Sequence, residues 1–337
     1  MKRYGNIYDQ IATMENLQLA HQNAKRGKNH YTEVQMVDAN PEYYLAIIRE
    51  QLINKTYRTS PYVVFAKNDK GKEREIYKLP YFPDRIVHHA IMNVLEPYFM
   101  RHFIYDTYAA MKGRGIHLGL RRLHEAMKDR EATRYCLKLD VKKFFPSVHH
   151  ETLKELLAQK FKDGDLLWLL GEIIDSVPGE TNVPIGNYLS QYFCNFYLSG
   201  FDHWIKEVKR EKNYFRYMDD MVILSGSKAH LHALFREIRA HLDEHLRLTI
   251  KGNWQVFPTY IRGVDFLGYR SFGDYTLLRK STAKAFKRKM RVFQRLSPVT
   301  DHAKRSMASY GGWIKWCNGF NLSQKYMKPI LERRESI

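Results

Sequence analysis

The chain has 337 residues, 44% of them hydrophobic and 27% charged, which is enough for two or three packed subdomains. Its 55 Lys+Arg against 36 Asp+Glu give a net charge of +19, which favours a polyanionic partner such as nucleic acid. No apolar run approaches the roughly 18 residues of a membrane-spanning helix, and no signal-peptide core follows the first residues, so we expect a cytoplasmic protein without membrane contact. Its three cysteines lack metal or disulfide spacing and fit reduced core positions.

The first sixty residues carry helical patterns. Ile7, Ile11 and Met14 recur at helical spacing. Asn40-Pro41 forms a good N-cap and first-turn pair for a helix over residues 41–52. We therefore expect a helical N-terminal extension.

Residues 62–79 change to a strand pattern. Aromatic and β-branched residues lead into the turn sequence Asn68-Asp69-Lys70-Gly71 and then into a second strand-like stretch, which predicts a hairpin. Lys67 and Arg74 lie beside its tip. Asp84 then has the position of an N-cap for a helix, and Gly113-Arg114-Gly115 precedes another.

The stretch from Tyr135 to Val141 alternates as a strand. Leu137, Leu139 and Val141 share one face, and Asp140 faces the other way near the strand's end. Two helices are expected next, around residues 153–157 and 166–170. A long helix from about residue 187 to 208 would bury one stripe made of Leu189, Phe193, Phe196, Gly200 and Trp204.

Tyr217-Met218-Asp219-Asp220 lies between two aromatic and apolar stretches, which predicts strand, tight turn and strand with the acids at the tip. Adjacent carboxylates repel each other unless a cation lies between them, and hard oxygen ligands suit Mg²⁺ in two-metal phosphoryl chemistry. A solvated Asp-Asp turn is the alternative, because Asp is a common turn former.

The surrounding elements give that turn a context. A strand at 135–141, a helix at 187–208, strands at 214–217 and 220–225, a helix at 229–246 and a strand at 248–251 follow one another. This order is the split βαβ pattern of a ferredoxin-like sheet, in which Asp140 and the Asp219-Asp220 turn converge on neighbouring strands.

The C-terminal region is strongly basic, since residues 273–337 hold 15 Lys+Arg and 4 Asp+Glu, a net charge of 15 − 4 = +11. One helix is expected from Ser281 to Leu296, with Phe286, Met290 and Phe293 as its buried stripe. An ordinary solvated basic face is one reading of the opposite side, and a nucleic-acid contact is the other. The basic residues of that side are Lys284, Lys287, Arg288, Arg291 and Arg295.

These features together resemble the palm of a reverse transcriptase. The Tyr217-Met218-Asp219-Asp220 string matches that family's Tyr/Phe-x-Asp-Asp motif, and residues 138–145 match its first-aspartate motif. The resemblance implies an α+β right-hand polymerase fold with fingers, a ferredoxin-like palm and a helical thumb. The expected subdomains are an N-terminal helical extension (1–60), fingers (61–134 and 149–183), palm (135–148 and 184–272) and thumb (273–337).

The resemblance also implies two-metal nucleotidyl transfer. Asp140, Asp219 and the Val141 carbonyl would bind two Mg²⁺ ions, or Mn²⁺ in their place, with Asp220 beside them. Lys251 would protonate the pyrophosphate leaving group.

Other residues would bind the incoming dNTP. Lys67 and Arg74 would grip its triphosphate, and Phe145, or Phe144 in its place, would exclude a ribose 2′-hydroxyl. The alternatives are a surface charge for each cation and a core position for the phenylalanine.

One motif narrows the resemblance. Most reverse transcriptases carry Gln-Gly after the proline, whereas this chain has Ile185-Gly186, and residues 185–191 match the Ile/Val/Leu-Gly-x-x-x-Ser-Gln motif of diversity-generating retroelement reverse transcriptases. Residues 108–115 resemble the Tyr-Ala-x-x-x-Gly-Lys-Gly stretch of that family, with Arg114 for Lys. Ile185 lacks the amide that could restrain a mispaired base, so we expect lower fidelity unless Ile185 is only a core residue.

The family implies an RNA-directed DNA polymerase of a bacterial or phage-infected cell that makes cDNA mutated at adenines from a template-repeat RNA. Its partners would be an RNA template, a DNA primer, dNTPs, a small basic accessory protein and a structured retroelement RNA. An antiphage-defence or retron-like reverse transcriptase is the first alternative. A non-catalytic RNA-binding scaffold is the second, against which the intact acids argue.

Overall fold

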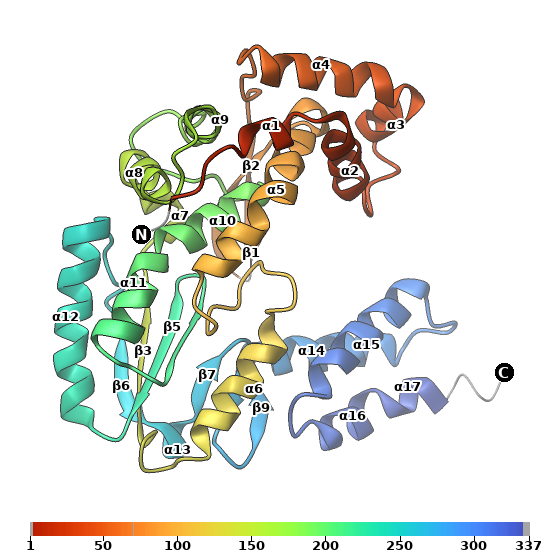
Figure 1. Cartoon of the computed structure of the whole chain (residues 1–337). Coiled ribbons are helices and arrows are strands. Elements are labelled where there is room, and N and C mark those ends of the chain that lie inside the picture. Colours follow the sequence, from red (N-terminus) through yellow and green to blue (C-terminus); the bar gives the residue numbers. More distant parts are fainter. Residues whose placement is uncertain (1–2, 70, 333–337) are drawn as a thin grey trace. The chain divides into compact units, whose positions relative to one another are not determined.

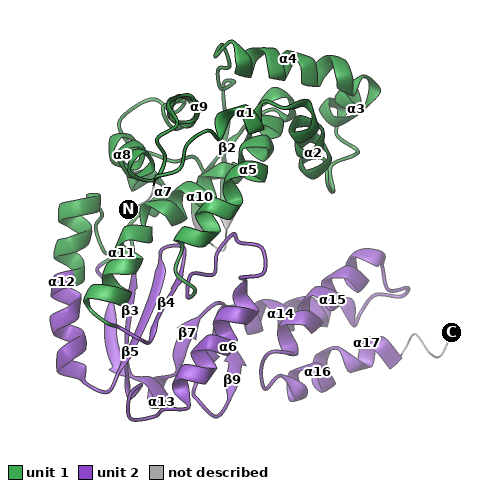
Figure 2. Ribbon diagram, viewed as in Figure 1, with its two compact units in different colours: residues 1–105, 141–210, 238–251 green, residues 106–140, 211–237, 252–337 purple. Residues whose placement is uncertain are grey.

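The computed structural model describes residues 3–69 and 71–332. The chain divides into two compact units, and each is assembled from three separate stretches of sequence (Figure 2). Unit 1 comprises residues 1–105, 141–210 and 238–251, and unit 2 comprises residues 106–140, 211–237 and 252–337. The predicted subdomain boundaries follow a different division and stay a prediction. The expected thumb ends in residues 333–337, which lie outside the described residues.

Unit 1 begins with short helices (Figure 1). The expected helical N-terminal segment is confirmed, although Ile11 and Met14 belong to separate helices, because the Thr13 hydroxyl accepts a hydrogen bond from the Asn16 amide and starts a new helix. The Asn40 cap is confirmed, since its side chain accepts from the Tyr43 amide. The helices are α1 (Tyr8–Ile11), α2 (Met14–Ala24), α3 (Thr32–Ala39) and α4 (Pro41–Ile53).

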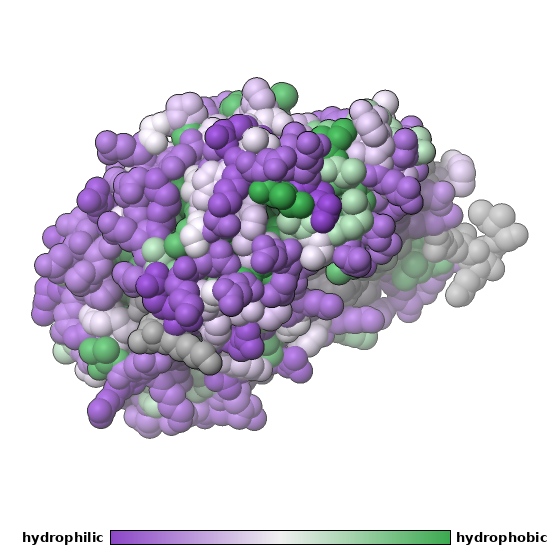
Figure 3. Space-filling view, turned by 45° about the horizontal axis from the view of Figure 1, so that its top comes forward, coloured by the Kyte–Doolittle hydropathy of each residue, from purple (hydrophilic) through white to green (hydrophobic). Residues whose placement is uncertain are grey.

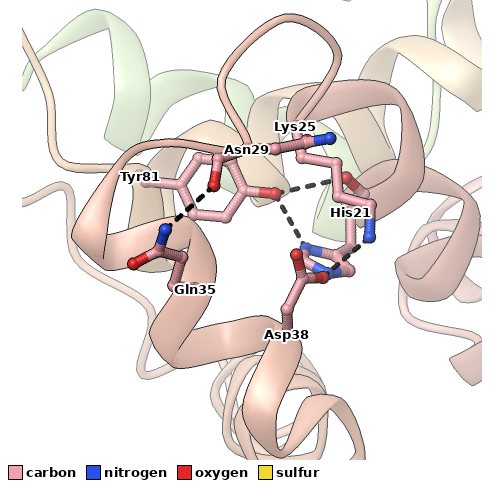
Figure 4. A network of polar contacts seen from close by, with 6 residues as sticks. All are labelled: His21, Lys25, Asn29, Gln35, Asp38 and Tyr81. Carbon is pink, nitrogen blue, oxygen red and sulfur yellow. Dashed lines mark hydrogen bonds and ion pairs between the residues drawn. The ribbon is translucent and has the colours of Figure 1, made fainter.

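A polar network fastens α2 and α3 to the residues that follow the hairpin (Figure 4). The Tyr81 hydroxyl lies 2.8 Å from His21 Nδ1, and His21 Nε2 lies 2.8 Å from Asp38 Oδ1. Lys25 Nζ donates to the same carboxylate oxygen at 2.7 Å. Because His21 and Tyr81 are buried, these bonds satisfy polar groups that water does not reach.

The predicted hairpin is confirmed as β1 (Val63–Asp69) and β2 (Lys72–Lys78), although Lys70 at its tip lies outside the described residues. A kinked segment η1 (Tyr81–Arg85), in which Phe82 has an extended backbone, leads into α5 (Ile86–His102). The expected Asp84 cap is wrong. The buried Asp84 carboxylate instead accepts hydrogen bonds from the Tyr57 hydroxyl and the Ser60 amide. It therefore stabilises the segment that precedes the hairpin.

The middle of unit 1 is helical. The helices expected around residues 153–157 and 166–170 are confirmed. The expected long helix is interrupted at Leu198 and changes to π-helical hydrogen bonding at Trp204, and Gly200 of its predicted stripe is exposed. The first piece is buried on nearly all sides, so its sequence has no single apolar stripe to read. These helices are α7 (Phe144–Ser147), α8 (His150–Lys160), α9 (Gly164–Ile174), α10 (Tyr188–Tyr197), α11 (Ser199–His203) and the π-helical η2 (Trp204–Val208).

Unit 2 contains an antiparallel four-stranded sheet in the order β4-β5-β3-β6. This is the strand order expected of a ferredoxin-like sheet, with the first strand inside and the last at its edge. One strand prediction is wrong, because residues 248–251 form only a single bridge, from Ile250 to Val141. The strands are β3 (Tyr135–Asp140), β4 (Tyr214–Tyr217), β5 (Asp220–Ser225) and β6 (Gln255–Pro258).

One face of this sheet packs against α6 (Ile116–Met127). Leu123 and Met127 of α6 join Cys136 and Val222 of the sheet in one buried cluster. Lys138 and Asp140 continue the Cys136 face of β3, because alternate residues of a strand point the same way. Cys136 and Cys194 are buried as expected, whereas Cys317 is only partly buried.

The C-terminal part of unit 2 adds a small sheet and a helical bundle. The expected stripe of Phe286, Met290 and Phe293 is buried, but α14 ends at Phe293, so Arg295 lies in the turn beyond the helix. The predictions missed four further helices among the described residues of this part. The elements are α13 (Thr259–Arg262), β7 (Val264–Phe266), β8 (Tyr269–Ser271), β9 (Thr276–Leu278), α14 (Lys280–Phe293), α15 (Asp301–Ile314), α16 (Phe320–Tyr326) and α17 (Lys328–Glu332).

The predicted helix over residues 229–246 is confirmed as α12 (Lys228–Leu246), whose two ends belong to different units. Among the described residues, no helix combines the length and the apolar character needed to cross a bilayer. Hydrophilic side chains predominate on the face that Figure 3 shows, with hydrophobic ones scattered among them.

Candidate active site

The structure brings two of the predicted carboxylates directly opposite each other. Asp140, the last residue of β3, pairs with Asp220, the first residue of β5. Side chains of directly paired residues in antiparallel strands point to the same face, roughly 5 Å apart at Cβ. The sequence-based expectation that these acids converge on neighbouring strands is therefore confirmed.

Asp219 lies in the turn between β4 and β5. Tyr217 pairs with Asp220, which leaves Met218 and Asp219 as a two-residue loop. Met218 has a φ of +54°, a left-handed conformation that costs energy for a residue with a side chain. Asp219 is therefore the second residue of a tight turn that begins directly after β4 and ends at Asp220.

Arg216 stabilises that turn, and sequence reasoning missed it. Its side chain is buried, and its Nη1 donates a hydrogen bond to the Met218 carbonyl at 3.0 Å. Its backbone amide donates to the Asp106 carbonyl, and its own carbonyl accepts from the Tyr108 amide. The available signal was a cation within the otherwise apolar strand β4.

Lys138 is the second residue that was missed. Its Nζ lies 2.9 and 3.2 Å from the two carboxylate oxygens of Asp220 and also donates to the Asp265 carbonyl. The side chains of Lys138 and Asp220 are 28% and 23% exposed. The Lys138 ammonium thus neutralises the negative charge of Asp220, which lies close to Asp140.

The pKa of Asp220 is raised above its usual value, chiefly by burial and further by the charge of Asp140. Lys138, and more weakly Arg279, act in the opposite direction. A further cation beside these two carboxylates would reduce the repulsion between their negative charges.

A cavity of about 420 Å³ opens beside these acids within unit 2. Lys138, Asp140 and Asp220 line it from the sheet, and Arg262, Arg270 and Arg279 line it from the segment that follows. Arg279 Nε donates to Asp265 Oδ1 at 2.5 Å. A cavity with both acids and several cations suits a ligand that is itself anionic and brings metal ions.

The carboxylate oxygens of Asp140 and Asp220 could fill part of the coordination shell of Mg²⁺. Carboxylate oxygens are the ligands this ion prefers, and it usually keeps water or substrate phosphates for its remaining positions. Within the described part of the chain, no three His, Cys, Asp or Glu side chains gather into a closed ligand set. The arrangement therefore fits a metal ion whose coordination shell is completed by the substrate. It does not fit an ion that is coordinated by protein side chains alone.

The predicted dNTP residues lie in unit 1. Lys67 and Arg74 are directly paired across the hairpin, and both side chains are exposed. Phe144 is buried and Phe145 only half-buried, so Phe145 is the one of the two with exposed ring surface.

Ile185 and Gly186 lie against the hairpin. The Ile185 carbonyl accepts a hydrogen bond from the Tyr77 amide at 2.9 Å, which adds this segment to the edge of β2. Gly186 has a φ of +122°, and a Cβ there would lie 3.0 Å from the Tyr77 carbonyl oxygen. Only glycine combines this backbone with so close an approach.

Lys251 follows the bridge between Ile250 and Val141, and its side chain is half-buried. The Lys142 amide donates to the Thr249 carbonyl at 2.8 Å, so this segment runs beside the residues that follow Asp140. Of the basic residues predicted on the thumb, Lys284, Arg288, Arg291 and Arg295 are exposed, and Lys287 is half-buried.

Comparisons with known proteins agree with this geometry. A family described as "Reverse transcriptase (RNA-dependent DNA polymerase)" matches residues 65–271. Protein YkfC of Escherichia coli (strain K12) is 25% identical over 278 residues, which cover 70% of this chain and 73% of that protein. Nuclear intron maturase 4, mitochondrial, of Arabidopsis thaliana is 26% identical over 143 residues, which cover 40% of this chain. An uncharacterized 91 kDa protein in cob intron of Schizosaccharomyces pombe is 26% identical over 192 residues, which cover 54% of this chain.

The matched part is only 18% and 23% of the length of the last two proteins. Among solved structures, telomerase from Candida albicans has a TM-score of 0.51 at 11% identity, over 86% of this chain and 65% of that one. Apo telomerase from Candida tropicalis has a TM-score of 0.50 at 14% identity, over 69% of this chain and 50% of that one. This likeness concerns the fold, and it confirms the predicted right-hand polymerase architecture.

The family match covers more than half of the 337 residues and includes all three carboxylates. It confirms the enzyme class that those carboxylates indicated. The chain belongs to the reverse transcriptase family, the RNA-directed DNA polymerases.

Proposed function

We propose that the protein is the reverse transcriptase of a diversity-generating retroelement and makes cDNA mutated at adenines from a template-repeat RNA. The observation that carries its polymerase chemistry is the pairing of Asp140 with Asp220 beside the Asp219 turn. The observation that favours the retroelement is the Ile185–Gln191 motif, whose first residue is bonded to β2.

In this proposal Asp140, Asp219 and the Val141 carbonyl hold two Mg²⁺ ions, with Mn²⁺ as a substitute. When bound, the ions would activate the primer hydroxyl and neutralise the triphosphate. Asp220 stays beside them with Lys138 as its counter-ion.

The remaining roles belong to this chain's own side chains. Lys67 and Arg74 bind the triphosphate of the dNTP, and their direct pairing across the hairpin places two cations side by side. Phe145 presents its ring to the sugar and excludes a 2′-hydroxyl. Lys251 delivers a proton to the departing pyrophosphate.

Nucleic-acid contacts come from the thumb in this proposal. Lys284, Lys287, Arg288 and Arg291 of α14, with Arg295 after it, bind the phosphates of the RNA template and the DNA primer. A small basic accessory protein and a structured retroelement RNA complete the assembly in the cytoplasm of a bacterial or phage-infected cell.

Ile185 is the residue to which we assign the errors. Its backbone position is fixed by the bond to Tyr77, but its side chain offers no hydrogen bond to a base pair. A site without that polar restraint discriminates less against a misaligned pair.

The test is sequencing of cDNA made on a primed RNA template that contains adenines. Asp219→Asn with Asp220→Asn should abolish Mg²⁺-dependent synthesis, and retained synthesis would refute the assigned carboxylates. Ile185→Gln should keep synthesis and lower misincorporation opposite adenine. An unchanged error spectrum would show that Ile185 is only a packing residue.

A second candidate is an intron-associated reverse transcriptase. Two relatives carry "intron" in their names, and the relative from Arabidopsis thaliana is called a maturase. Selective binding of an intron RNA, together with faithful copying of adenines, would favour this candidate. Copying of an adjacent repeat with adenine-specific errors would favour the retroelement.

A further inference from the structure

The buried arginine of β4 belongs to a chain of contacts that runs from α6 to the Asp219 turn, within unit 2. The side chain of Arg216 is fully buried, and its guanidinium donates to the Met218 carbonyl at 3.0 Å. Burying an arginine is costly unless its donors are bonded. Here one of the bonded groups is the backbone of the turn that carries Asp219.

Residues 106–108 cover the edge of the sheet beside Arg216. The Arg216 amide donates to the Asp106 carbonyl at 3.0 Å, and the Tyr108 amide donates to the Arg216 carbonyl at 3.1 Å. Thr107 and Arg216 form a parallel bridge. Because β4 is the edge strand of the four-stranded sheet, these bonds give it a second neighbour directly before the turn.

The Asp106 carboxylate fastens this segment to α6. Its Oδ1 accepts hydrogen bonds from the Tyr108 hydroxyl at 2.7 Å and from Arg122 Nε at 3.0 Å. The Asp106 side chain is 6% exposed, and that of Arg122 is 43% exposed. Removing one partner of a pair that includes a buried charge leaves that charge uncompensated. Loss of Arg122 should therefore disturb residues 106–108.

The Tyr108 side chain has little room to adjust to such a disturbance. Burial, and then the charge of Asp106, raise the pKa of Tyr108, so its hydroxyl keeps the proton that it donates. A Cβ added at Gly119 of α6 would lie 2.9 Å from Tyr108 Cδ2, and the ring packs in one buried cluster with Leu123. A displacement of residues 106–108 would thus be passed on to the backbone of β4.

We infer that Arg122, acting through Asp106 and Arg216, positions the Asp219 carboxylate for catalysis. The inference rests on the proposed catalytic role of Asp219. The turn needs such support because Met218 has a φ of +54°, which is unfavourable for a residue with a side chain. Arg122 acts through other residues and is therefore a positioning residue.

The test is steady-state primer extension by the full chain with Arg122→Gln. The kcat should fall about tenfold, since a shift of about 1 Å in a catalytic group can cost up to about a hundredfold. The KM for the dNTP should stay unchanged, because Lys67 and Arg74 belong to unit 1. Mn²⁺ binding in the absence of nucleic acid, followed by electron paramagnetic resonance, should weaken about tenfold. Arg122→Lys keeps the charge and should recover most of both losses.

The matched control is Arg121→Gln, which removes the same charge from the adjacent, exposed position of α6. It should leave the kcat and the Mn²⁺ affinity unchanged. All assays are run well below the melting temperature of each variant, so loss of folded protein does not lower the kcat. A wild-type kcat in Arg122→Gln would overturn the inference, and so would equal decreases in the two variants.

Arg216→Met supplies a second arm. If Arg122 acts through Arg216, the double variant Arg122→Gln/Arg216→Met should have the kcat of Arg216→Met alone. Losses that multiply would contradict the chain of contacts. Where Arg216→Met does not fold, Arg122→Gln and its control still decide the inference.

Asp219→Asn separates this inference from the proposed function. Synthesis retained in Asp219→Asn would refute the catalytic role of that acid and the positioning together. Loss of synthesis in Asp219→Asn, with a wild-type kcat in Arg122→Gln, would refute only the positioning.

Discussion

At the scale of single residues, the sequence identifies the acids but not the groups that hold them. Asp140, Asp219 and Asp220 stand in local patterns of strand and turn that predict where they lie. Lys138 bonds a residue 82 positions away in sequence, and no local pattern specifies that partner. The role of Arg216 could not be predicted either, because the hydrogen bond from its side chain to the Met218 carbonyl is visible only in the folded turn.

Lys138→Met should destabilise unit 2 and weaken polymerisation. The substitution keeps the length of the side chain but leaves the carboxylate of Asp220 without its ammonium partner. We expect a loss of roughly 1–3 kcal/mol in unfolding free energy, the usual range for removal of a hydrogen bond to a charged group. Thermal or urea unfolding measures it.

The matched control is Lys128→Met, which removes an exposed ion pair with Glu125. It should change the stability by less than about 0.5 kcal/mol. The double variant Lys138→Met/Asp220→Asn should recover part of the stability, because residue 220 then carries no charge that lacks its ammonium partner. Equal losses for Lys138→Met and Lys128→Met would contradict the role of this pair.

At the scale of elements, the sequence predicted those helices and strands whose stabilising contacts are with residues close in sequence. The hairpin of β1 and β2 and the helix α12 follow from turn residues and periodicity. The expected strand at 248–251 failed because Leu248 and Ile250 are buried in alternation without a strand to pair with, while Gln255–Pro258 pairs with β3. Alternating burial gives a segment the same sequence pattern as a strand. Only the three-dimensional structure shows which of the two segments pairs with β3.

The basic side of α14 gives a prediction at this scale. Replacing Lys284, Arg288 and Arg291 together by Ala should weaken binding to a primer–template duplex on the order of tenfold. The slope of log affinity against log salt should fall by roughly 0.9 for each phosphate that the variant no longer neutralises. Filter binding at several salt concentrations measures both quantities.

The control replaces three exposed cations of α12, Lys228, Arg236 and Arg239, by Ala. Both triple variants remove the same charge, so a general electrostatic effect would weaken binding equally in the two. A larger decrease in affinity for the α14 variant would locate the nucleic acid at α14. Equal decreases would show that α14 has no special place on the nucleic acid.

At the scale of the whole molecule, the two units are interleaved along the chain, and a linear reading of subdomains does not predict that. Residues 141–210 leave unit 2 directly after Asp140 and belong to unit 1. Composition changes little at these crossings, and no linker marks them. The division is set by which segments pack together, so it becomes visible only in three dimensions.

The distribution of histidines over the two units gives the last prediction. Burial lowers the pKa of His88, His89, His102 and His241 from 6.5 to about 4, and all four belong to unit 1. An unfolded chain binds protons at these residues near pH 6.5, whereas the folded unit resists them. The stability they contribute is therefore complete above about pH 6.5 and is lost progressively as the pH falls toward 4. His203, whose pKa is raised, opposes this trend in the same unit.

Hydrogen exchange at pH 7 and pH 5, corrected for intrinsic rates, should show unit 1 losing more protection than unit 2. His88→Leu should reduce that loss, because it removes one of the titrating groups, while His302→Gln at an exposed position of unit 2 should not. Unit 1 would then open first in acid while the sheet that carries Asp140 and Asp220 keeps its protection. If unit 2 lost protection first, the buried histidines would not be the groups that limit stability in acid.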